Sequence, residues 1–251
     1  MFNFFANMGD RVQDTYTLSG ADFNHIKNVL RMGIGDTILV SFNGKSDLCE
    51  IVSFEEDCVN AKIIEENVND TELPIEITLF QALPKSDKME LIIQKTVELG
   101  ISKIVPVEMK HCVVKLDEKK KNSKVARWQA ISESAAKQSK RNIIPKIENV
   151  ISFSQMLIEV QNLDLFIVPY ENKNGMEATR NVLERIKSGI KIGILIGPEG
   201  GFDVKEIDRA IKAGGNAVSL GKRILRTETA AISAVSMVML YSEINLGGED
   251  H

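Results

Sequence analysis

At 251 residues the chain is long enough for one or two domains, and its composition (43% hydrophobic, 6% aromatic) is typical of a globular protein with a substantial core. Three cysteines without a CxxC pair and three histidines far apart in the sequence argue against a disulfide framework and against a metal site. The first residues hold too short an apolar run for a signal peptide and no segment has the pattern of a membrane span, so we expect a cytoplasmic protein.

The formal net charge of −4 is unevenly distributed along the chain. Residues 110–146 hold eleven Lys or Arg and three acidic residues, a net charge of +8, so the remainder carries −12. A basic segment on an acidic protein is consistent with an RNA-facing patch, and also with a solvated loop and helix face. Charge alone therefore leaves a nucleic-acid partner open.

Residues 1–70 are expected to form a small, mostly β domain. The expected elements are a strand over 2–6, a helix over 19–30, and strands over 37–42, 48–54 and 58–64. Asn43-Gly44 is a strong hairpin signal, and several short strands with one helix indicate a compact barrel. The acidic segment 65–74, which ends in Pro74, is the expected domain boundary.

Residues 75–248 alternate predicted strands and helices, which indicates an α/β domain with a parallel sheet. Strands are expected over 75–82, 101–107 and 163–168, and helices over 89–100, 128–138, 153–160 and 176–187. The run 191–196 is nearly all apolar, as in a strand buried on both faces.

Two glycine-bearing loops dominate the end of the chain. The first, 197–201, leads into a helix whose start has the capping-box spacing Asp203 to Glu206. The second, 221–226, follows a short strand over 217–220 and precedes a last helix from Thr227. In open α/β sheets, ligands bind at the carboxyl ends of strands, so these loops are the expected site.

The residues of both loops resemble one family. GPEGGF at 197–202 and LGKRILRTETA at 220–230 resemble the 16S rRNA uridine-N3 methyltransferases, which belong to the knotted SPOUT class. The similarity extends to the segment 85–107, to HIKNVLR at 25–31 and to AAKQSKR at 135–141. It implies a parallel-sheet methyltransferase domain with a trefoil knot, preceded by a PUA-like β-barrel that binds RNA.

The chain departs from the family pattern at two places. Asn3 stands where the family usually has an arginine before the Phe-Phe pair, which removes one expected interaction with a phosphate. His111-Cys112 stand where an Arg-Ser pair is typical, and Cys112 is expected to be a small buried hydrophobe.

The resemblance implies S-adenosylmethionine as cofactor, bound by the two loops. Backbone N–H and C=O groups of glycine loops can recognise an adenine, and the absence of GxGxxG argues against a dinucleotide-binding oxidoreductase. The implied cofactor-binding residues are Ile196, Gly197, Pro198, Gly200, Gly201, Leu220, Gly221, Ile224, Leu225 and Arg226.

Five residues are candidates for contacts with the RNA substrate: Arg31, Lys85, Lys88, Gln138 and Arg141. Arg31, Gln138 and Arg141 lie in segments similar to the family, and an arginine offers a planar fork to a phosphate or base edge. Lys85 and Lys88 follow a predicted strand, where RNA contact and simple surface exposure are both consistent interpretations.

Arg226 and Glu199 are the candidate catalytic residues. The N3 of uridine must lose a proton before it is methylated. Arg226 could stabilise the resulting uracil anion, as donors of an oxyanion hole do. Glu199 could accept the proton, or could instead serve only to stabilise the N-terminus of the next helix.

The favoured hypothesis is therefore a methyltransferase that acts on N3 of a uridine in 16S rRNA or in the small ribosomal subunit. The alternative is a non-catalytic RNA-binding factor in ribosome assembly that retains the fold. Small apolar residues on the last helix, with the resemblance, favour a homodimer, and no membrane partner or metal is expected.

Overall fold

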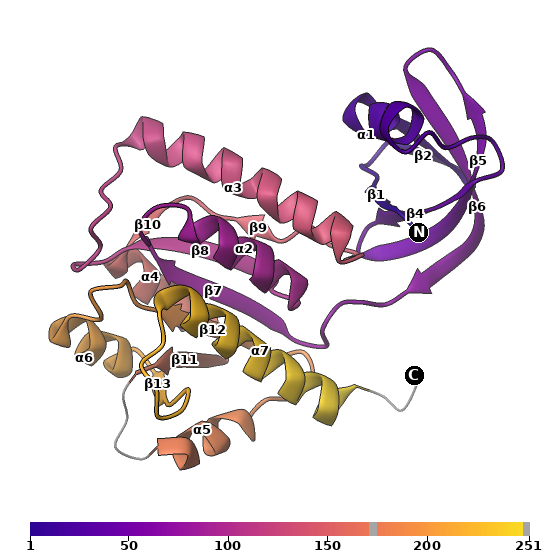
Figure 1. Cartoon of the computed structure of the whole chain (residues 1–251). Coiled ribbons are helices and arrows are strands. Elements are labelled where there is room, and N and C mark those ends of the chain that lie inside the picture. The colour runs from indigo at the N-terminus through magenta and orange to yellow at the C-terminus, as the bar shows by residue number, and fades with distance from the viewer. Residues whose placement is uncertain (171–174, 248–251) are drawn as a thin grey trace. The chain divides into compact units, whose positions relative to one another are not determined.

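The computed structural model describes residues 1–170 and 175–247, so residue 248, the last of the expected second domain, lies outside the described residues. The chain forms two compact units (Figure 1). The first comprises Met1–Glu72 with Ala136–Ile144, and the second Leu73–Ala135 with Pro145–His251. The break after Glu72 falls inside the acidic 65–74 segment. The inclusion of 136–144 in the first unit was not anticipated from the sequence.

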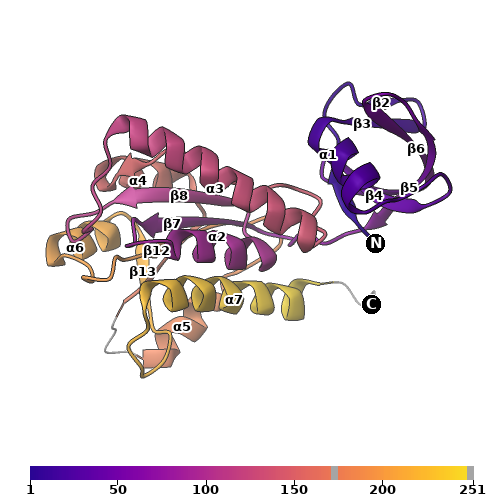
Figure 2. The ribbon, with the colours of Figure 1, turned by 45° about the horizontal axis from the view of Figure 1, so that its top comes forward.

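The first unit is built on a mixed sheet of six strands in the order β1-β4-β5-β6-β3-β2. β1 pairs with β4 in parallel and the other neighbours are antiparallel. The strands are β1 (Asn3–Phe5), β2 (Arg11–Val12), β3 (Thr15–Ser19), β4 (Thr37–Phe42), β5 (Lys45–Phe54) and β6 (Cys58–Asn69). Figure 2 shows these strands curling into a barrel-like shape, as expected for the first domain.

Local sequence explains two features of this unit. Asn43 and Gly44 both have positive φ (50° and 77°), as a type I′ turn requires, and they join β4 to β5 at the expected position. The helix expected over 19–30 is instead α1 (Gly20–Asn24) followed by a π-helical turn, His25–Val29. Ile26 is the fully buried residue of that turn, and it joins the core formed by Phe4, Tyr16, Leu18, Ile38, Val40, Cys49, Ile51, Val59 and Ala61.

The second unit is a parallel sheet with the order β10-β8-β7-β12-β11-β13, and β9 pairs with β8. The strands are β7 (Glu76–Ala82), β8 (Lys103–Glu108), β9 (Lys146–Ile147), β10 (Ile151–Ser152), β11 (Leu165–Pro169), β12 (Lys191–Ile196) and β13 (Gly215–Val218). The helices are α2 (Lys88–Glu98), α3 (Glu118–Gln138), α4 (Phe153–Glu159), α5 (Gly175–Leu183), α6 (Val204–Lys212) and α7 (Thr227–Leu246). The alternation predicted from the sequence is confirmed.

β12 lies inside this sheet, between β7 and β11, and its apolar residues are buried as the sequence predicts. The helix expected over 128–138 begins ten residues earlier, at Glu118. The charged residues at the start of α3 have good helix propensity but carry no apolar period, which first becomes visible near Trp128.

After the edge strand β13 the chain returns to the middle of the sheet, where α7 packs against α2, β7 and β12 (Figure 1). The stripe Ala231, Ala234, Val235 and Val238 is fully buried in this contact. By length and composition alone α7 is long and apolar enough to cross a membrane, so the expectation that no segment has the pattern of a membrane span was wrong. A core helix of a soluble protein meets the same criterion, because it too is apolar along its length.

Candidate cofactor and substrate site

The loop after β12 is shaped by its glycines. Gly201 has a φ of +72°, which favours glycine. A Cβ at Gly197 would lie 3.0 Å from the ring of Phe202, and a Cβ at Gly200 would lie 3.1 Å from His111 Cβ. The loop then ends at Asp203, whose carboxylate accepts the Lys205 N–H and caps α6. A Cβ at Gly197 or Gly200 would therefore press on the Phe202 ring or on His111, and that neighbour would have to shift.

A buried hydrogen-bond relay fixes the start of this loop. The Thr227 hydroxyl donates to the Gly197 carbonyl at 2.7 Å and accepts from the Gln81 side-chain amide at 3.0 Å. Gln81 is fully buried at the end of β7, and its Oε1 has no hydrogen-bond partner among the described residues. Sequence reasoning missed both residues, because a single Gln and Thr nearly 150 positions apart give no local signal.

Lys88, Glu199 and Glu228 form a group that we call the charge cluster. Glu199 Oε1 accepts from the Lys88 ammonium and from the Lys85 backbone N–H, both at 3.0 Å. The same ammonium lies 3.4 Å from Glu228 Oε2. The three side chains are 27%, 21% and 14% exposed, in the order Lys88, Glu199, Glu228.

These contacts favour the charged forms of Lys88 and Glu199. Partial burial by itself would raise the pKa of Glu199, but the hydrogen bonds from the Lys85 N–H and Lys88 outweigh it and lower the pKa below its ordinary value. The hydrogen bond to Glu199 raises the pKa of Lys88, with a further contribution from Glu228. Glu199 is therefore an engaged carboxylate and a weak base.

The second loop joins β13 to α7. Gly221 has a φ of +106°, and its N–H donates to the Ser219 hydroxyl. Ser219 is itself held by the Thr179 hydroxyl through both its N–H and its carbonyl. Ile224 is fully exposed, with Leu225 half-buried beside it. An apolar side chain left wholly in water at a loop tip is available for contact with a ligand.

Arg226 occupies the N-cap position of α7 and is exposed. Among the described residues its guanidinium has no hydrogen-bond or ion-pair partner. Its neighbour Thr227 is buried in the relay to Gly197, so the backbone of Arg226 is anchored next to the first loop while its side chain remains free. This is the arrangement expected of a group that meets its partner only when a ligand binds.

A third segment, after β8, also reaches the first loop. The Lys110 ammonium pairs with Asp203 at 2.5 Å, and the Lys110 N–H donates to Glu206 at 3.0 Å. His111 Nδ1 lies 3.2 Å from the Gly201 carbonyl. Cys112 beside it is buried, and burial raises the pKa of its thiol, in agreement with its expected role as a small hydrophobe. Lys110 and His111 were not among the predicted site residues.

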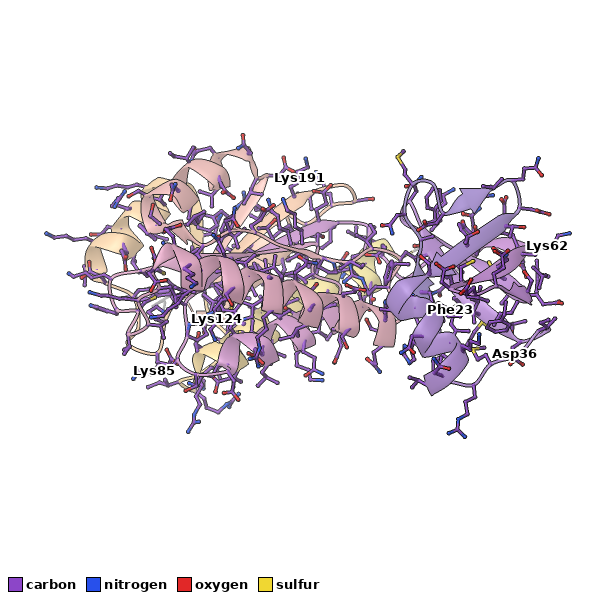
Figure 3. All side chains as sticks on the ribbon, turned by 90° about the horizontal axis from the view of Figure 1, so that it is seen from above. Phe23, Asp36, Lys62, Lys85, Lys124 and Lys191 are labelled. Carbon is purple, nitrogen blue, oxygen red and sulfur yellow. The ribbon has the colours of Figure 1, made fainter. Side chains whose placement is uncertain are left out.

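The residues predicted to bind RNA fall into two groups. Lys85 and Lys88 lie in the second unit near Glu199, with Lys85 exposed in the loop after β7 (Figure 3). Arg31 and Gln138 lie in the first unit and are exposed, and Arg31 has an unusual positive φ of 54° just after the π-helical turn. Such turns and backbone conformations concentrate at functional positions.

Arg141 is placed differently from the surface ligand that the sequence suggested. It is 3% exposed, and its guanidinium binds both carboxylate oxygens of Glu72. Glu72 also accepts the backbone N–H of Asn142 and Ile143, while Asn3 donates to the Arg141 carbonyl. These bonds fix the segment 136–144 in the first unit. Asn3 thus has a structural role in place of an interaction with a phosphate.

The basic segment 110–146 is largely neutralised within the fold. Seven of its eleven cations have ion pairs with described residues: Lys110, Lys120, Lys121, Arg127, Lys137, Arg141 and Lys146. Lys124, on α3, is half-buried and has no such pair among the described residues (Figure 3). No group of three or more potential metal ligands occurs in the described part of the chain.

A PUA-like sheet and a parallel α/β unit with glycine loops at strand ends are the two parts expected of an RNA methyltransferase. Two domain families agree: the RNA methyltransferase domain matches residues 71–239, and the RNA methyltransferase PUA domain matches residues 18–64. Ribosomal RNA small subunit methyltransferase E of Bacillus subtilis is 39% identical over 239 residues, covering 94% of this chain and 93% of that protein. The chain therefore belongs to the ribosomal RNA small subunit methyltransferase E family.

Two solved structures extend this similarity to the whole fold. The enzyme of this family from Neisseria gonorrhoeae, bound to S-adenosylmethionine, has a TM-score of 0.77 and 34% identity, covering 94% of this chain and 96% of its own. A Legionella pneumophila protein in complex with the same cofactor has a TM-score of 0.82 and 30% identity, covering 95% and 97%.

Proposed function

We propose that this chain transfers the methyl group of S-adenosylmethionine to N3 of a uridine in 16S rRNA. The observation that carries the proposal is the pair of loops at the carboxyl ends of β12 and β13, joined through Thr227 and Gly197, with Arg226 unpaired beside them. The family and the cofactor bound to two similar structures support it.

The residues present fit this cofactor. Gly197 and Gly200 allow the loop backbone to lie close against Phe202 and His111, and the buried Gln81 Oε1, linked to Gly197 through Thr227, lacks a hydrogen-bond partner among the described residues. Residues 196–201 and 220–226 would hold the adenosyl group through their backbone and apolar side chains. When bound, the cofactor supplies an electrophilic methyl group on a sulfonium.

Arg226 is the residue placed to stabilise negative charge on the uracil. Loss of the N3 proton spreads negative charge over the uracil ring, and a guanidinium without internal partners can donate to it without breaking an existing bond. The loops otherwise align donor and acceptor and exclude water, which is most of what a direct methyl transfer requires.

The proposal is tested by measuring cofactor binding and rRNA methylation separately. Calorimetry should show S-adenosylmethionine binding to the protein alone, and rRNA from a strain lacking the gene should lack N3-methyluridine by nucleoside mass spectrometry. Cofactor binding without loss of that nucleoside would point to another methylated position. Absence of cofactor binding would favour the non-catalytic assembly factor.

The substrate is proposed to be 16S rRNA, free or in the small subunit, contacted by the exposed residues Arg31, Gln138 and Lys85. A cytoplasmic location follows from that substrate. Crosslinking of the protein to rRNA, followed by mapping of the linked residues, tests these contacts, and links confined to other surfaces would contradict them.

We further propose that the protein is a homodimer that uses α7. Leu240 and Ile244 on this helix are 49% and 76% exposed, an apolar surface opposite the buried stripe. Light scattering should give about twice the mass of one chain. Leu240→Glu should shift it toward the monomer, and a wild-type monomer would contradict the proposal.

We propose that the second unit contains a trefoil knot, because the family that the chain resembles belongs to a knotted class. The return of the chain from the sheet edge at β13 to the centre at α7 supports it. A crystal structure in which the chain after β13 passes through no loop would rule the knot out.

A further inference from the structure

The charge cluster joins three segments that are far apart in the sequence. Lys88 lies in the first turn of α2, Glu199 in the loop after β12, and Glu228 in the first turn of α7. Glu199 stands between Pro198 and Gly200, in the centre of the proposed cofactor loop. Whatever holds the Glu199 side chain therefore also holds the backbone of that loop.

The contacts of Glu199 do not suit a general base. Its Oε1 already accepts two hydrogen bonds, from the Lys85 N–H and the Lys88 ammonium. Proton transfer to this carboxylate would remove the charge that both donors stabilise. A general base must instead have a pKa near the working pH and a lone pair directed at the proton it accepts.

We propose that Lys88, Glu199 and Glu228 are positioning residues that hold the loop 197–201 for the methyl donor, and that Glu199 does not accept the N3 proton. This inference rests on the proposed function, and it gives Glu199 a role different from the general base considered above. Lys88 is the cation that contacts both carboxylates of the charge cluster. Glu228 Oε2 is buried and has no hydrogen-bond partner among the described residues, so the ammonium at 3.4 Å is its counter-ion.

Removing the ammonium should therefore disturb the loop itself. Without Lys88, two partly buried carboxylates would lie near each other with no cation between them, and their repulsion would push them apart. Lys88→Met should weaken S-adenosylmethionine binding by about tenfold, the effect of losing one partner of a partly buried pair. Lys88→Arg should recover most of that affinity, since a guanidinium can reach two carboxylates.

A matched control lies on the same helix. Lys95 is also paired with a carboxylate, Glu98, but on the outer surface of α2. Lys95→Met should leave cofactor affinity within about twofold of wild type, as expected for a surface pair. Calorimetry on the full chain measures all three variants without RNA. Equal cofactor affinity in Lys88→Met and Lys95→Met would overturn the positioning role.

The second arm separates positioning from base catalysis. In Glu199→Gln the amide oxygen can still accept from the Lys85 N–H and from Lys88. We expect cofactor affinity to fall by no more than about tenfold, while the single-turnover rate at saturating cofactor keeps the wild-type pH profile. A loss of roughly 10²–10⁴-fold in rate together with a vanished acidic limb would identify Glu199 as the base and refute the inference.

Control measurements distinguish a failure of the positioning role from a failure of the proposed methyltransferase function. If the wild-type protein neither bound S-adenosylmethionine nor methylated rRNA, the proposed function would fail before any variant was compared. Thermal unfolding followed by circular dichroism identifies a variant that does not fold. If Lys88→Met does not fold, the question is decided by Lys88→Arg and Glu199→Gln. A cofactor affinity of Lys88→Arg within about threefold of wild type supports the positioning role, and a much lower affinity contradicts it.

Discussion

Arg226 offers the sharpest test of the proposed chemistry, through the substitution Arg226→Ala. Its side chain is exposed, occupies the N-cap position without capping α7, and has no partner among the described residues. Its removal should therefore change the free energy of unfolding by less than about 0.5 kcal/mol, as for other free surface residues. The effect should instead fall on the rate. Loss of one donor to a developing anion costs about 2.7–4 kcal/mol, which is roughly 10²–10³-fold in methyl transfer.

The assay is single-turnover methylation of rRNA at saturating S-adenosylmethionine, with cofactor affinity measured in parallel by calorimetry. A group that acts in the transition state lowers the rate far more than it lowers cofactor binding. Arg226→Lys should recover little, because an ammonium cannot reproduce the planar fork. A near-wild-type rate in Arg226→Ala would refute the reasoning, as would equal losses in rate and in cofactor affinity.

Four further predictions concern other parts of the fold. Glu72→Gln should destabilise the first unit by roughly 3 kcal/mol in urea unfolding, because it removes the charge of the carboxylate whose two oxygens bind the buried guanidinium of Arg141; an unchanged midpoint would show that the pair contributes nothing. Gly200→Ala should weaken cofactor binding by about tenfold, since its Cβ would press on His111, whereas Gly33→Ala, with open space around it, should not. The hydrogen bond from the Lys110 ammonium lowers the pKa of Asp203 in the folded state, so the stability that this carboxylate contributes is present above its unfolded pKa of about 4 and is lost as the pH falls through the folded value. The difference in melting temperature between wild type and Asp203→Asn should therefore shrink between about pH 6 and pH 3, and a constant difference would contradict the assignment. Lys85→Ala should weaken RNA binding and reduce its salt slope by about 0.7–0.9 for each phosphate that the protein no longer neutralises, whereas Lys191→Ala, exposed at the opposite end of the sheet, should leave the slope unchanged.

The local sequence was sufficient to predict the parallel sheet and the glycine-bearing turns of this protein. Alternating strand and helix patterns determine the parallel sheet, and the apolar run of β12 requires burial on both faces. The Asn43-Gly44 turn and the glycines at 197, 200, 201 and 221 are local requirements of backbone geometry, so they could be read directly from the residues. The family resemblance rests on the same short segments.

Tertiary structure decided how the charged residues are used. Arg141 has the local context of a surface ligand, yet Glu72, 69 residues earlier, turns it into a buried anchor. Glu199 has the local context of a helix-end carboxylate, yet Lys88, 111 residues earlier, binds it. A charge is visible in the sequence, but its partner is set by which strands and helices are neighbours in space. Local periodicity carries no record of that adjacency, because Coulomb attraction and hydrogen bonding depend on distances that only the folded chain establishes.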